Sequence, residues 1–71
     1  MARVLELWDI SGKGEERTND SVTLTDDGRL VYSGSGIQPL FAKFLTNHSP
    51  EDVFNRMDGW SNGYAALRER T

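Results

Sequence analysis

Apolar and β-favouring residues open the chain. Residues 2–10 are rich in Val, Leu, Ile and Trp, and a Ser-Gly-Lys-Gly stretch follows them. This composition predicts a strand that ends at residues which break regular structure. Period-two alternation sets Leu5 and Leu7 on one strand face and Val4 and Trp8 on the other. Since both faces carry apolar side chains, we expect both to need cover.

The following stretch, 12–20, has the opposite character. It contains charged residues and two glycines but no apolar side chain. Such a segment has little to bury, so the pattern predicts a mobile loop.

Residues 21–33 hold two β-favouring runs separated by Asp-Asp-Gly, which predicts a hairpin. A two-residue loop would set Leu24 opposite Val31, whereas a three-residue loop sets Leu24 opposite Leu30. Only the second register gathers the apolar side chains on one face. We therefore expect a type I turn with Gly28 in a left-handed conformation at a bulge.

Helical periodicity begins after a Ser-Gly-Ser-Gly connector. Apolar residues recur at helical spacing, which predicts an amphipathic helix, and they are Ile37, Leu40, Phe41, Phe44 and Leu45. Ser49 followed by Pro50 and two acids predicts the start of a second helix that ends at Gly59. A third short helix is expected from Tyr64 to Arg70, with arginines near its negative end.

The order of these elements is strands first and helices afterwards, which is typical of the α+β class. We predict one domain, residues 1–71. It consists of a three-stranded antiparallel sheet, made by the N-terminal strand and the hairpin, followed by two or three short helices packed on one face.

Composition narrows the class of protein. The chain has 71 residues, 37% of them hydrophobic, with no cysteine and a net charge of −3. The absence of cysteine excludes disulfides and thiolate metal sites. The negative charge disfavours non-specific binding to nucleic acid or anionic membrane. No apolar run has the length of a membrane span or of a signal peptide, so we expect a cytoplasmic protein.

Candidate chemistry is sparse. His48 is the single imidazole, and adjacent acids on a strand or helix point apart, so neither indicates a catalytic pair or a metal site. The connector 33–36 joins a strand to a helix, and its backbone N–H groups are weak candidates for anion binding. We predict no catalytic residue, no cofactor and no metal.

Two functions remain. The helix pair within 38–58 has the spacing of a helix-turn-helix, which makes nucleic-acid binding the alternative, although the second helix begins with acids. The favoured hypothesis is a protein-interaction or regulatory module that binds a protein partner or forms a homodimer. Its predicted contact residues are the strand leucines, which a one-sided helix layer would leave uncovered, and two aromatics of a glycine-flanked turn, namely Leu5, Leu7, Trp60 and Tyr64.

Overall fold

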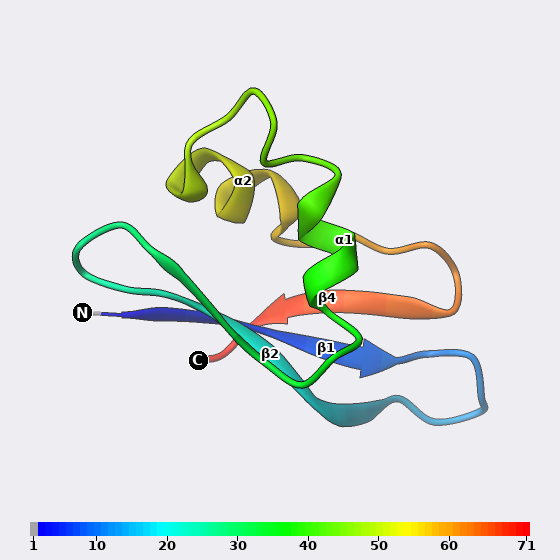
Figure 1. Cartoon of the computed structure of the whole chain (residues 1–71). Helices are drawn as coiled ribbons and strands as arrows, with labels where there is room; N and C mark the ends of the chain where they lie inside the picture. Colours follow the sequence, from blue (N-terminus) through cyan, green and yellow to red (C-terminus); the bar gives the residue numbers. More distant parts are fainter. Residues whose placement is uncertain (1) are drawn as a thin grey trace.

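The structure of the protein is a computed structural model that describes residues 2–71. It is an α+β fold in which both helices lie over one face of a four-stranded antiparallel sheet of order β3-β2-β1-β4 (Figure 1). The predicted class is confirmed, but the prediction of three strands is wrong. The elements in chain order are β1 (Arg3–Asp9), β2 (Glu16–Leu24), β3 (Leu30–Ser33), α1 (Gln38–Ala42), α2 (Pro50–Met57) and β4 (Ala65–Glu69).

The fourth strand replaces the predicted C-terminal helix. β4 pairs with β1, placing Leu67 opposite Leu7 and Arg68 opposite Glu6. Leu67 faces the helices and is fully buried, whereas Arg68 lies on the opposite face. Alanine, leucine and arginine favour helix locally, but a half-buried strand position beside β1 overrides a preference worth only tenths of a kcal/mol per residue.

The predicted loop over 12–20 is also shorter than expected, because β2 begins at Glu16. Trp8 pairs with Arg17, and the register shifts between Glu6 and Trp8. Inside this irregularity the Thr18 hydroxyl donates to the Leu7 carbonyl at 2.7 Å. Backbone pairing with β1 therefore extends a strand through residues that have no apolar side chain to bury.

The hairpin prediction is confirmed. Leu24 pairs with Leu30, and the Gly28 N–H donates to the Thr25 carbonyl at 3.0 Å. Gly28 has a φ of 83°, as a bulge after a type I turn requires.

The start of α2 agrees with prediction, while α1 is shorter than its apolar period suggested. The Ser49 hydroxyl caps α2 by accepting the Asp52 N–H at 3.2 Å, and Pro50 is its first residue. Regular α1 structure ends at Ala42. Phe44 and Leu45, each 38% exposed, consequently lie outside the core that the pattern assigned them to.

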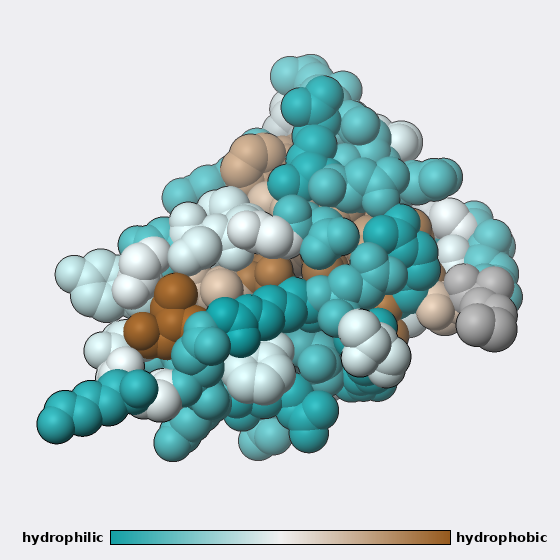
Figure 2. Space-filling view, turned by 180° about the vertical axis from the view of Figure 1, so that it is seen from behind, coloured by the Kyte–Doolittle hydropathy of each residue, from teal (hydrophilic) through white to brown (hydrophobic). Residues whose placement is uncertain are grey.

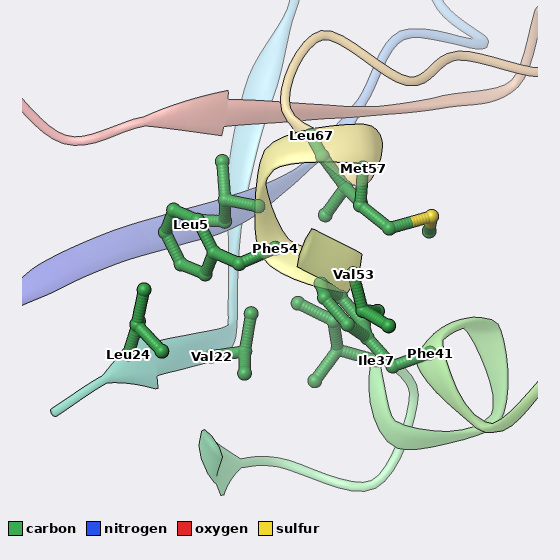
Figure 3. Packing of buried hydrophobic residues seen from close by; sticks show 9 residues of the cluster. All are labelled: Leu5, Val22, Leu24, Ile37, Phe41, Val53, Phe54, Met57 and Leu67. Carbon is green, nitrogen blue, oxygen red and sulfur yellow. The ribbon is translucent and has the colours of Figure 1, made fainter. Parts of the chain in front are cut away.

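The core lies between the sheet and the two helices. Leu5 is fully buried there, and Leu7 packs against it from the side. Strand side chains meet the helix side chains in one cluster, shown in Figure 3, whose members are Leu5, Val22, Leu24, Ile37, Phe41, Val53, Phe54, Met57 and Leu67. The expectation that the strand leucines would be left without cover is therefore wrong for Leu5, while Leu7 is partly covered.

The sheet face away from the helices is closed by charged side chains. Glu6 is only 6% exposed, and its Oε2 accepts from Arg17 at 3.2 Å and Arg70 at 3.0 Å. The Arg68 guanidinium lies 5.2 Å from the centre of the Trp8 ring. Arginine stems can cover apolar surface while their heads stay in water, so they cover this face around Glu6 and Trp8, whereas Val31 on β3 stays 49% exposed.

Candidate functional site

The four residues predicted to contact a partner lie in different environments. Leu5 has no exposed surface and so is not available to a partner in this fold. Leu7 and Trp60 are partly buried against the core. Tyr64 is 73% exposed in the turn before β4, where its side chain faces solvent. The structure thus leaves Trp60 and Tyr64 accessible but does not bring them into one site.

Trp60 borders an apolar groove between the two helices. The groove encloses about 140 Å³ and is lined by side chains from α1, the turn after it, the end of α2 and the segment before β4, namely Leu40, Lys43, Phe44, Met57 and Trp60. Four of the five lining side chains are apolar. We call this feature the Trp60 groove.

The sequence after α2 holds Trp60 in place. Gly59 has a φ of 82°, a left-handed conformation that reverses the chain after α2. The Trp60 N–H then donates to the Met57 carbonyl at 2.9 Å. The Trp60 carbonyl accepts the Leu67 N–H at 2.8 Å. The Trp60 backbone is therefore held to both α2 and β4, and its side chain packs against the core.

Further lining residues come from the end of α1 and the turn after it. The Phe44 N–H donates to the Phe41 carbonyl at 2.9 Å, which continues the helical turn by one residue beyond Lys43. Phe41 is fully buried, while Phe44 stays at the surface. Lys43 forms no ion pair with any of residues 2–71, so its ammonium group at the rim is available to an acidic group.

The sequence did not identify Leu40, Phe44 and Met57 as site residues. All three fit the apolar period of a helix. A residue in the core and a residue that lines a groove give the same period, so the pattern does not distinguish them. No local signal separates them, because the polar run that begins at Thr46 follows the whole apolar period, whereas regular α1 structure ends at Ala42.

Most of the surface is hydrophilic, and apolar groups form only small areas in the view of Figure 2. A second hollow, of about 240 Å³, lies beside Glu6 and is polar. A third hollow of about 210 Å³ lies beside Arg3 and Glu51. All three volumes are below the roughly 300 Å³ at which small-molecule pockets begin, so they fit single side chains better than a cofactor.

The backbone of residues 33–36, the candidate anion site, binds a carboxylate of the chain itself. The Gly36 N–H donates to Asp20 Oδ2 at 3.2 Å, and this carboxylate lies directly against Gly34. A carboxylate of the chain itself thus takes the position that a bound anion would have.

His48 is part of an exposed ion-pair group. Its Nδ1 lies 2.7 Å from Asp52 Oδ2, which also accepts from Arg56 Nε at 3.0 Å. The Arg56 hydrogen bond, together with His48, holds the pKa of Asp52 below its usual value. Asp52 is favoured in the first turn of α2 by the positive end of the helix, and its pairs with His48 and Arg56 are four residues apart in the chain. This group therefore stabilises α2.

The first turn of α2 is acidic. α2 has Glu51 and Asp52 in its first turn, the end that a recognition helix directs toward the bases.

Within residues 2–71, neither helix has the length and apolar character to cross a membrane.

Comparison of the chain with protein-family models, with curated proteins and with solved structures finds no match. The geometry of the Trp60 groove therefore carries the functional argument.

Proposed function

We propose that this domain is a protein-interaction module that holds one apolar side chain of its partner in the Trp60 groove. The observation that carries the proposal is a small apolar hollow lined by the Trp60 indole, whose backbone is held by hydrogen bonds, and by the 38% exposed Phe44 ring. An apolar cavity of roughly this size accommodates a benzene ring, so a single Leu, Met or Phe side chain fits.

The rim indicates the chemistry of the partner. Lys43 lines the groove and has no carboxylate partner within the described chain. An acidic residue next to the apolar anchor would pair with Lys43 and fix the orientation of the bound segment. The preferred partner segment therefore has an apolar residue adjacent to Asp or Glu.

The expected affinity is modest. Burying one aliphatic or aromatic side chain contributes about 1.5–3 kcal/mol, and the exposed lysine adds at most about 1 kcal/mol. Together these contributions reach at most about 4 kcal/mol, which corresponds to a Kd on the order of millimolar, and flanking backbone contacts are expected to tighten the complex further.

A selection experiment tests the proposal. A phage-displayed peptide library is enriched on the wild-type domain and counter-selected on Phe44→Ser, a change at the surface that spares the core. Enriched peptides should share an apolar residue beside an acid, and their affinity should fall about tenfold or more for Phe44→Ser and for Trp60→Ala. Tyr64→Ala, which alters an exposed aromatic outside the groove, is the matched control and should bind as wild type.

Lys43→Glu provides a second readout that does not depend on packing. It should shift the enriched peptides from acidic to basic neighbours of the anchor. All variants are compared at equal folded fraction, measured by circular dichroism. Peptides that bind Phe44→Ser as tightly as wild type, or that show no common anchor, would contradict a role for the groove.

A further inference from the structure

The two edge strands of the sheet, β4 and β3, differ in whether their outer backbone groups are hydrogen-bonded. On β4, the outer edge is paired with the segment that follows α2, where the Leu67 N–H donates to the Trp60 carbonyl and the Asn62 N–H donates to the Ala65 carbonyl at 3.1 Å. On β3, no hydrogen bond among residues 2–71 reaches the outer edge of the strand. One edge is therefore covered by the chain itself, and the other presents its backbone to solvent.

The hairpin register shows which backbone groups point outward from β3. Thr25 N–H donates to the Arg29 carbonyl at 2.8 Å, so these opposite residues form a hydrogen-bonded pair. Such pairs alternate along an antiparallel ladder, which makes Thr23 and Val31 the next hydrogen-bonded pair. Leu30 and Tyr32 then direct their N–H and C=O groups away from β2.

The usual devices that protect an edge strand are missing from β3, apart from its short length. The strand Leu-Val-Tyr-Ser contains no charge, no proline and no bulge. Val31 is 49% exposed at the end of a row that crosses the uncovered sheet face from Val4 through Thr23. The row stops at Val31 because no further strand follows.

We propose that β3 pairs antiparallel with β3 of a second copy of this chain, with Val31 opposite Val31 of the second copy. In this register Leu30 lies opposite Tyr32 of the second copy, so the outward N–H and C=O groups of both strands meet in hydrogen-bonded pairs.

The side chains fit the same arrangement. On the helix side, each Leu30 meets the Tyr32 of the other copy, an aliphatic–aromatic cross-strand pair that extends the core. On the other side the two valines meet at a non-hydrogen-bonded position, where side chains approach most closely. The two Arg29 residues lie at opposite ends of the paired strands, so no like charges face each other. This self-complementarity favours a second copy over an unrelated strand.

The pairing is expected to be weak. A strand of four residues buries far less than the roughly 1,200 Å² of a stable interface. We expect a dissociation constant on the order of 100 µM to 1 mM, so dimers should form only at high protein concentration.

Charge substitutions at Val31 test the register. In sedimentation equilibrium, the apparent mass of the wild type should rise from 8.0 kDa toward twice that value as its concentration approaches about 2 mM. Val31→Lys and Val31→Glu alone should each remain at the monomer mass, because like charges would face each other across the two-fold axis. An equimolar mixture of the two variants should associate again. Tyr64→Lys, which places the same charge at another exposed position, should behave as wild type.

Several results would overturn the proposal. These are a wild type that stays at 8.0 kDa throughout, a Val31→Lys variant that associates as wild type, or a mixture that fails to restore association. Phe44→Ser distinguishes association through the β3 edge from association through the Trp60 groove. Association lost in Phe44→Ser but kept in Val31→Lys would assign the dimer to the Trp60 groove instead.

Discussion

The two faces of the sheet are closed in different ways. Neighbouring residues of β1 show the contrast, since Leu5 is fully buried beneath the helices while Glu6 is buried on the other face beneath arginines. The helix-covered face depends on shape and apolar area. The other face depends on long, half-exposed side chains that can move without opening a cavity, so substitutions there should cost much less.

The largest expected effect is from Leu5→Glu. It removes a core side chain and places a carboxylate in an apolar layer without a partner, a combination expected to cost more than about 4 kcal/mol. A domain of this size seldom has more than about 3–5 kcal/mol of stability, so the variant should be unfolded by circular dichroism and NMR dispersion. A cooperative melt close to that of wild type would contradict the placement of Leu5.

The connection from the sheet to the helix layer should be the next most sensitive region. Gly34 has a φ of 87°, and a Cβ there would overlap the Asp20 carboxylate. We expect Gly34→Ala to cost about 2–3 kcal/mol in urea unfolding. Gly28→Ala is the matched control, with a φ of 83° but nothing within 4 Å, and should cost about 1 kcal/mol. Equal losses would mean that Asp20 does not pack against Gly34.

Glu6→Leu sharpens the comparison from the charged side. Its partners Arg17 and Arg70 are more than half exposed, so they lose little when the carboxylate is removed, and a leucine can pack under their stems. The free energy of unfolding should change by less than about 1 kcal/mol. A loss above about 3 kcal/mol would show that the ion pairs, and not side-chain cover, hold this face together.

The smallest effect concerns the charged rim of the helix-covered face. Arg3 donates to both carboxylate oxygens of Glu69 at 2.8 Å, and this hydrogen bonding holds the pKa of Glu69 below its usual value. A lowered folded-state pKa adds stability that is present above the unfolded pKa and is lost as pH falls through the folded pKa.

Wild type should therefore be slightly more stable than Glu69→Gln at pH 7, and the difference should shrink below about pH 4. Urea titrations at the two pH values measure it. A difference that stays constant between pH 7 and pH 3 would exclude the Arg3 pairing as its source.

The Trp60 groove was only partly visible in the sequence. Trp60 could be singled out as a large aromatic beside a glycine turn. Phe44 could not, because its helical spacing is equally compatible with burial, and only the end of α1 at Ala42 leaves it at the surface. The apolar period continues to Leu45, so it does not show that regular helix ends at Ala42.

Local signals determined the parts of the fold that depend on a few adjacent residues. Asp-Asp-Gly together with the apolar pattern of the two strands it joins specifies the hairpin register, and Ser49 with Pro50 specifies the start of α2, because hairpin pairing and end capping use groups close in the chain. Tertiary structure alone decided that residues 65–69 form a strand and that the leucines of β1 face the helices. The first outcome depends on pairing with β1, about 60 residues away, and the second on packing against helix side chains distant in the chain, and a local pattern has no information about either partner.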